Sequence, residues 1–282
     1  MTLRESPLVS TAWLFEHIEA PDIRVADASW YLPQARRDAR AEYAAAHIPG
    51  SVFFDIDELS DENSELPHML ASPAKFASRM RKLGLGDGNL VVLYDGAGLY
   101  SAPRAWWMLR AMGHEDVVVL DGGFPKWKRD HGPLEDLFPE LTPRHFTPRV
   151  NYALIRDFRQ MRNNRETPRE SVVDFRSAPR FAGREKEPRA GVRPGHIPGS
   201  VNLPYTELVS TDGTLKQRDV LERLFSEAGV DVARPIVTTC GSGITAAIGA
   251  LALAAIGAHD VALYDGSWAE WGTRSEAPVE TA

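Results

Sequence analysis

The chain of 282 residues carries two copies of one sequence pattern. The hexapeptide His-Ile-Pro-Gly-Ser-Val occurs twice, and so do a strand-like run that enters a glycine turn and an Asp-Gly pair followed by tryptophan. The matching blocks are 47–52 with 196–201, 91–98 with 236–243, and 121–127 with 265–271. Blocks that recur in one order at an offset of about 145 residues, close to half the chain, indicate a tandem duplication of one domain rather than a solenoid of short repeats.

The stretch between the copies is rich in proline and has little apolar periodicity, which is typical of a stiff linker. We therefore predict a first domain over 1–135, a proline-containing linker over 136–150 and a second domain over 151–282. The final residues, 277–282, are predicted to be disordered.

Each copy alternates short apolar strands with amphipathic helices, which predicts an α/β fold with a mostly parallel sheet flanked by helices. The expected strands are 23–28, 89–94, 117–120, 172–176, 235–239 and 261–264. The expected helices are 73–83, 101–112, 216–228 and 244–256. Ligands of such sheets bind outside the carboxyl ends of the strands, and Asp95 and Cys240 both follow a strand in a glycine-rich turn.

Composition excludes several classes of protein. The net charge of −7 argues against a nucleic-acid-binding surface, and the one cysteine excludes a disulfide framework, a redox pair and a multi-cysteine zinc site. No secretory signal is visible at the N-terminus, so we expect a cytoplasmic protein. The uncharged stretch 235–258 contains a polar glycine turn, and we interpret it as a strand, a turn and a buried helix rather than a membrane span.

Cys240 opens the segment Cys-Gly-Ser-Gly-Ile-Thr between a predicted strand and a predicted helix. Two glycines allow the backbone to curl, so that successive N–H groups form an anion-binding nest beside a helix N-terminus. Both features favour the thiolate, which is the nucleophilic form of cysteine. The alternative is a buried structural cysteine, the commonest fate of a lone one.

Three activities could use such a loop. Phosphate-ester hydrolysis needs an arginine that clamps the phosphate, typically six residues after the cysteine, but Ala246 stands there. Dinucleotide binding fits the spacing of Gly241, Gly243 and Ala246, but that fingerprint normally opens a domain with several later strands, and here one strand follows. Sulfur transfer needs a thiolate and a nest that stabilises a persulfide anion, and nothing in the sequence opposes it.

With two such copies and one cysteine loop, the chain resembles the two-domain rhodaneses. Its neutral Cys-Gly-Ser-Gly loop resembles their 3-mercaptopyruvate sulfurtransferase branch rather than the thiosulfate branch, because the thiosulfate branch typically carries cationic residues after the cysteine. The resemblance covers nearly the whole chain and is carried by the histidine-proline turns, the cysteine loop and four further segments. These are 27–33, 99–104, 179–198 and 264–268. The resemblance implies two tandem rhodanese-like domains, of which the first is catalytically inactive because Asp95 stands where the second has Cys240.

The resemblance also implies a substrate site. Arg180 and Arg189 match the arginines that hold the carboxylate and carbonyl of the donor, and a planar guanidinium suits a carboxylate. Pro179 departs from the glycine that the family often has there. The loop residues that would contact the donor are Gly241, Gly243, Ile244 and Thr245.

For proton transfer, the resemblance implies a Ser-His-Asp arrangement of Ser242, His68 and Asp57, built across both domains. His can titrate near neutrality and a carboxylate can orient it; the alternative is that His68 is simply a surface-loop histidine. His47 and His196 occur in both copies, so we interpret them as structural residues that bond a backbone carbonyl beside the turn.

The sequence thus predicts a sulfurtransferase that moves sulfur from 3-mercaptopyruvate through a Cys240 persulfide to a thiol such as reduced thioredoxin, or to cyanide, with release of pyruvate. No metal, cofactor, nucleic acid or membrane partner is expected. The alternatives are a thiosulfate:cyanide sulfurtransferase and a non-enzymatic persulfide carrier.

Overall fold

The computed structural model describes residues 6–282 and divides into two compact units. The first unit contains the described residues up to Glu62, together with Leu70–Asn151 and Ser210–Leu215. The second contains Asn63–Met69, Tyr152–Val209 and Lys216–Ala282. Each half of the sequence therefore lends one short segment to the unit that the other half mainly forms.

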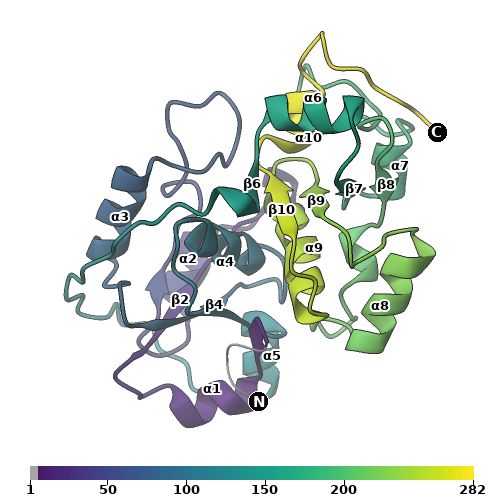
Figure 1. The fold of residues 1–282 in the computed structure, drawn as a ribbon. Helices are drawn as coiled ribbons and strands as arrows, with labels where there is room; N and C mark the ends of the chain where they lie inside the picture. Colours follow the sequence, from purple (N-terminus) through teal and green to yellow (C-terminus); the bar gives the residue numbers. More distant parts are fainter. Residues whose placement is uncertain (1–5) are drawn as a thin grey trace. The chain divides into compact units, whose positions relative to one another are not determined.

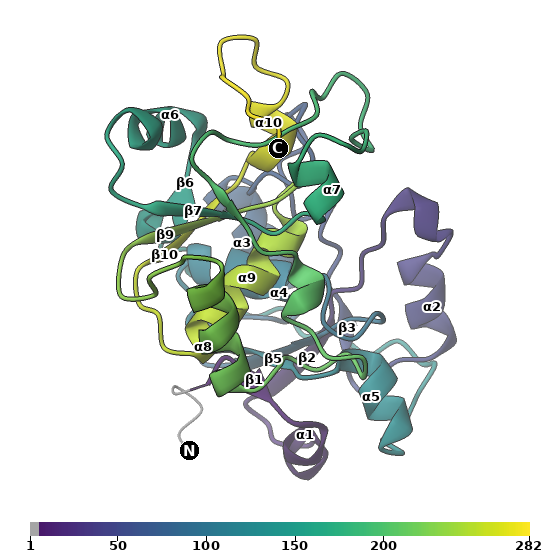
Figure 2. The same cartoon turned by 90° about the vertical axis from the view of Figure 1, so that its right-hand side faces the viewer.

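The first unit is built on a sheet of five parallel strands in the order β1-β5-β4-β2-β3. Its strands are β1 (Leu8–Val9), β2 (Ile23–Asp27), β3 (Val52–Phe53), β4 (Leu90–Tyr94) and β5 (Val117–Leu120). Its helices are α1 (Thr11–His17), α2 (Ala39–Ala45), α3 (Pro73–Lys82), α4 (Ala102–Ala111) and α5 (Gly123–Arg129). In Figures 1 and 2, α3 and α4 lie above the sheet and α1 and α5 lie below it.

The second unit repeats this plan with five parallel strands in the order β6-β10-β9-β7-β8. Its strands are β6 (Ile155–Arg156), β7 (Ser171–Asp174), β8 (Val201–Asn202), β9 (Ile236–Thr239) and β10 (Val261–Tyr264). Its helices are α6 (Phe158–Glu166), α7 (Ala178–Phe181), α8 (Arg218–Glu227), α9 (Ile244–Ala255) and α10 (Ser267–Trp271). In both views α6 and α10 lie above this sheet, and α8 and α9 lie below it.

The predicted fold class is confirmed, since both sheets are wholly parallel and covered by helices on both faces. Coverage on both faces explains why the central strands are apolar runs rather than alternating patterns: all four residues of β5 and of β9 are buried. The edge strands β1, β3, β6 and β8 escaped prediction because two residues are too few to show a period.

The repeated histidines anchor the two turns that follow them. The Nδ1–H of His47 donates to the Tyr43 carbonyl at 2.7 Å, and that of His196 donates to the Phe181 carbonyl at 2.8 Å. Both rings are buried, and each stacks on the side chain of the residue whose carbonyl it contacts. The prediction that these histidines bond a backbone carbonyl is confirmed.

A glutamate that follows each copy closes the same turn. Glu135 and His47 form a one-residue antiparallel bridge, as do Glu280 and His196, and each carboxylate accepts a glycine N–H of its turn. Each glutamate thus clasps the histidine turn of its own copy. The predicted disorder of 277–282 is wrong, because this tail is the second clasp and bonds back to the body of its unit.

None of the helices within residues 6–282 combines the length and the apolar character that a membrane span requires. The most apolar one, α9, has 12 residues, which rise about 18 Å and fall short of a bilayer core of about 30 Å.

Candidate active site

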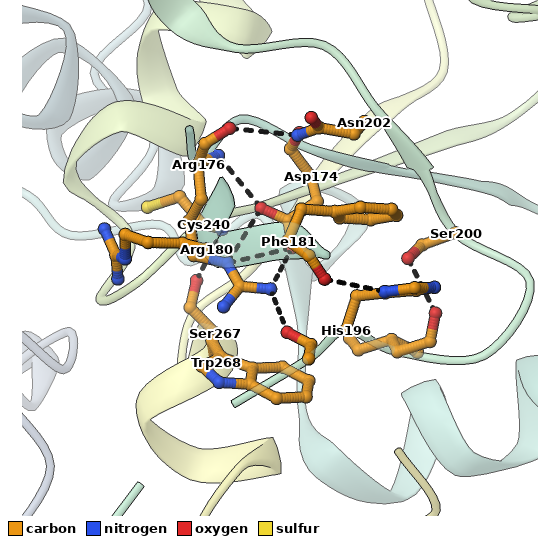
Figure 3. A network of polar contacts seen from close by, with 12 residues as sticks. Asp174, Arg176, Arg180, Phe181, His196, Ser200, Asn202, Cys240, Ser267 and Trp268 are labelled. Carbon is orange, nitrogen blue, oxygen red and sulfur yellow. Dashed lines mark hydrogen bonds and ion pairs between the residues drawn. The ribbon is translucent and has the colours of Figure 1, made fainter. Parts of the chain in front are cut away.

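Cys240 lies directly after β9, at the carboxyl edge of the second sheet. Its side chain is buried, with 2% of the residue exposed. Its carbonyl and that of Gly241 accept the N–H groups of Trp268 and Ala269 in the first turn of α10, at 2.9 and 2.8 Å. The strand and the neighbouring helix therefore fix the backbone on both sides of the thiol (Figure 3).

After the cysteine the chain turns once and enters α9. Gly243 has a φ of +82°, a conformation that costs glycine little, and the helix begins at the next residue. Within the described chain, the N–H groups of residues 242–246 donate to no protein acceptor. Unpaired N–H groups and the positive end of the helix dipole therefore come together just after the thiol, an arrangement that stabilises an anion.

The first copy shows what such a loop holds. The buried carboxylate of Asp95 accepts five backbone N–H groups within 3.0 Å, from residues 97, 98, 100, 101 and 102. The carboxylate of Asp95 thus occupies its own loop. The corresponding position in the second copy is the thiol of Cys240, so the second loop has no carboxylate at this place.

Ser267 supports the cysteine in a way that the sequence did not reveal. Its hydroxyl accepts the Cys240 N–H at 3.3 Å and donates to the Tyr264 carbonyl at 2.8 Å. Its φ is +49°, which is rare for a residue with a Cβ. The counterpart in the first copy is Gly123, with a φ of +51°. The second copy keeps the strained backbone and adds a hydroxyl that ties β9 to the start of α10.

Arg180 brings a positive charge to the cysteine loop. It lies in α7, and its Nη2 is 3.0 Å from the point where a Cβ on Gly241 would stand. The glycine thus makes room for the guanidinium beside Cys240 (Figure 3). Pro179 does not prevent this approach, because it occupies the first turn of α7, where a missing N–H is tolerated.

Behind Arg180 lies a buried network of ion pairs. Arg176, which is fully buried, makes a bidentate pair with Asp174 and donates through Nη1 to Glu187 at 2.8 Å. Arg180 donates to both oxygens of Glu187. The guanidinium of Arg176 also packs 4.5 Å over the Trp268 ring. The network therefore joins the end of β7, α7 and α10 behind the cysteine loop.

The other predicted site residues are placed as follows. Ser242, Gly243 and Ile244 are buried in the loop and the first turn of α9, while Gly241 and Thr245 are half-buried. Arg189 is half-buried in the loop between α7 and β8. His68 is buried and belongs to the second unit, through its segment Asn63–Met69. Asp57 is exposed, belongs to the first unit and accepts the Trp30 Nε1–H at 3.0 Å.

Sequence reasoning missed Glu187 and Ser267. Glu187 lies in a charge-dense stretch, where solvent exposure is the usual expectation, and its side chain is only 4% exposed. For Ser267 the repeat shows only that a serine stands where the first copy has Gly123, and the hydrogen bond to the Cys240 N–H is a tertiary contact.

Two parallel α/β units of one topology, with a cysteine at the carboxyl edge of only one sheet, are typical of tandem rhodanese-like proteins. The family model for the rhodanese-like domain matches residues 10–130 and again 157–274. The human 3-mercaptopyruvate sulfurtransferase is 46% identical over 274 residues, covering 95% of this chain and 92% of that protein. The bovine thiosulfate sulfurtransferase is 43% identical over 281 residues, covering 97% and 94%.

A solved structure agrees with this assignment. The crystal structure of the Escherichia coli 3-mercaptopyruvate sulfotransferase superposes with a TM-score of 0.86 at 43% identity, covering 93% of this chain and 99% of that one. The chain therefore belongs to the rhodanese-like family, in its 3-mercaptopyruvate sulfurtransferase branch.

Proposed function

We propose that the protein transfers sulfur from 3-mercaptopyruvate to a thiol acceptor through a persulfide on Cys240, and that pyruvate is released. The observation that carries this proposal is the Cys240 loop, which lacks the built-in carboxylate of the first copy and has Arg180 at its edge. The first copy, with Asp95 in place of the thiol, is proposed to be catalytically inactive.

In the first half-reaction the Cys240 thiolate attacks the sulfur of the donor. The new S–S bond forms while the C–S bond of the donor breaks, and the electron pair of that bond remains on the pyruvate enolate. One proton then completes the methyl group of pyruvate. Ser242, His68 and Asp57 are proposed to deliver this proton, and the membership of residues 63–69 in the unit that holds Cys240 supports His68 in this role.

In the second half-reaction an acceptor thiolate attacks the outer sulfur of the persulfide. The Cys240 thiolate leaves, and the acceptor carries away the sulfur as its own persulfide. Reduced thioredoxin is a proposed acceptor of this kind, and cyanide would take the sulfur as thiocyanate in an assay. Between the two steps, the N–H groups of residues 242–246 would stabilise the persulfide anion.

Arg180 and Arg189 are proposed to bind the donor carboxylate and carbonyl. Only a neutral segment follows the cysteine, from Gly241 to Ala246, so the donor would meet its positive charge on these two arginines. That arrangement suits a donor with one carboxylate better than the thiosulfate dianion. A thiosulfate preference in kcat/KM, measured for both donors on one preparation, would contradict this part of the proposal.

The test is pyruvate release from 3-mercaptopyruvate by the wild type and by Cys240→Ser. We expect the substitution to abolish turnover, and we expect only the wild type to gain the mass of one sulfur atom after exposure to the donor without acceptor. Equal pyruvate release by both proteins would refute a catalytic role for Cys240. A wild type that takes up sulfur on Cys240 from a low-molecular-weight persulfide but releases no pyruvate from 3-mercaptopyruvate would instead indicate a persulfide carrier.

A further inference from the structure

We propose that Glu187 is a positioning residue that holds Arg180 with one edge of its guanidinium turned to the Cys240 loop. This inference deepens the proposed function and rests on it, because Arg180 is the group that would bind the donor carboxylate.

The contacts of Arg180 divide its guanidinium into two edges. Its Nε donates to Glu187 Oε1 at 3.2 Å, and its Nη2 donates to Oε2. Throughout residues 6–282 its Nη1 has no hydrogen-bond acceptor, and the guanidinium end that carries Nη1 and Nη2 lies against Gly241. Glu187 therefore takes the inner edge in the fork geometry that arginine and carboxylate prefer, and the outer edge is left to a second carboxylate.

Glu187 is itself fixed. The oxygen that contacts Arg180 Nε also accepts Arg176 Nη1 at 2.8 Å. Arg176 is held in turn by Asp174 on two nitrogens and by the Gly195 carbonyl at 2.8 Å. Each of these three charged side chains is at most 4% exposed. A rigid, desolvated support of this kind reduces the conformational entropy that Arg180 would lose when a donor binds.

The charges of the network also balance. Asp174 and Glu187 match Arg176 and Arg180, so the carboxylate of a donor would be the first uncompensated charge in the cluster. Removal of Glu187 therefore has two opposite consequences for an incoming anion. Loss of a negative charge favours the anion, while loss of the support on Arg180 disfavours it. Whether a Glu187 variant receives an anion better or worse than the wild type therefore shows which of these two consequences dominates.

The experiment compares two alkylating probes that differ in one group. Iodoacetate and iodoacetamide both react with the Cys240 thiolate by displacement of iodide, but only iodoacetate carries a carboxylate. The ratio of their rate constants measures how well the site receives a carboxylate. Because both probes meet the same thiol, changes in its general reactivity cancel in the ratio.

We expect Glu187→Gln to lower the iodoacetate-to-iodoacetamide ratio by about threefold or more, toward the ratio of Arg180→Gln. In 3-mercaptopyruvate turnover it should raise KM more than it lowers kcat. The matched control is Glu185→Gln, which removes the same charge from an exposed position in the same loop and should leave the ratio unchanged. If Glu187→Gln does not fold, Glu187→Asp serves instead and should show a smaller fall.

An unchanged or increased iodoacetate-to-iodoacetamide ratio in a folded Glu187 variant would overturn the positioning role. A merely structural effect leaves the ratio unchanged, and the loss of a negative charge by itself increases it. A lowered ratio supports it even if the protein fails to release pyruvate from 3-mercaptopyruvate. The alkylation result and the turnover result therefore judge the inference and the proposed function separately.

Discussion

At the scale of single residues, one side chain decides whether the backbone N–H groups of the loop after the central strand have an acceptor within the protein. Asp95 and Cys240 occupy the same place in the two copies, yet the carboxylate of Asp95 takes five N–H groups that the shorter thiol does not. The backbone of the fold therefore forms the same loop twice, and the side chain at the end of the central strand determines whether the N–H groups of that loop are already paired.

A substitution of Ser267 tests whether the hydroxyl that accepts the Cys240 N–H contributes to pyruvate release. Ser267→Gly keeps the residue that the first copy uses at this φ, so release of strain and loss of a hydrogen bond should leave the free energy of unfolding within about 1 kcal/mol of wild type. We expect pyruvate release to fall several-fold because the Cys240 N–H loses its acceptor. Ser200→Ala, which removes a hydroxyl that donates to the Ile197 carbonyl, is the control for turnover assays and should be active.

Asp27 and Asp174 end equivalent strands, but among residues 6–282 an arginine pairs with Asp174 and none with Asp27. Burial raises the pKa of Asp27 to about 6 from an ordinary value of 3.8. The folded state then binds the proton more tightly than the unfolded state, so stability falls as the pH rises from about 4 to about 6. Asp27→Asn should abolish that loss and stabilise the protein at pH 7 by up to about 3 kcal/mol.

Thermal or urea unfolding across this pH range measures the effect. The Asp27→Asn advantage should vanish below about pH 4, where the wild-type side chain is protonated in both states. Asp174→Asn is the matched control and should destabilise at pH 7 by about 3–5 kcal/mol, because Arg176 would keep a buried charge without its main partner. An advantage for Asp27→Asn that does not change with pH would contradict the assignment.

At the scale of elements, the clasp formed by the tail after each copy holds the histidine turn. In the second copy the tail also contacts the end of α7, since the Ala282 N–H donates to the Ala182 carbonyl at 3.2 Å and Thr281 packs on Gly183. These contacts come directly after Arg180. The clasp of the second copy therefore supports the element that carries the proposed donor-binding arginine.

Deletion of residues 279–282 should raise KM for 3-mercaptopyruvate several-fold with a smaller change in kcat, because α7 loses its C-terminal contacts while Cys240 keeps its own. Steady-state kinetics of the truncated chain tests this. Glu135→Ala weakens the corresponding clasp of the first copy and should leave KM unchanged. Equal effects of the two changes on KM would show that the tail acts only through general stability.

At the scale of the whole molecule, the two copies exchange short segments. Asn63–Met69, which contains His68, belongs to the unit that holds Cys240, while Ser210–Leu215 belongs to the other unit. A fragment of residues 151–282 would therefore lack part of the unit that it is meant to form. We expect such a fragment to retain less than about a tenth of the kcat of the full chain for pyruvate release.

The full chain with His68→Ala is the comparison for that fragment, since it removes the side chain and leaves both units complete. We expect it to lower kcat by about 100-fold or more if His68 takes part in proton transfer. A fully active fragment, or a fully active His68→Ala, would contradict a site that draws on residues from the first half of the sequence.

Much of the fold was predictable because its signals are local. The central strands are apolar runs bounded by turn residues, and β5 and β10 begin and end at the predicted residues. The tail after residue 277 was predicted wrongly because its order comes from Ala277, which is buried, and from Glu280, which bonds across 84 positions to His196. A pairing over that distance leaves no periodic trace in the tail itself.

By itself, the sequence determined the duplication, the parallel α/β class and the place of Cys240 in a strand-loop-helix turn. These depend on repeated blocks and on short-range hydrophobic patterns. Only the tertiary structure decided that Glu187 is buried between Arg176 and Arg180, and that Ser267 supports the Cys240 N–H. Such contacts arise where separate strands end at one edge of a sheet, and the free energy of a buried ion pair depends on that environment rather than on residue type.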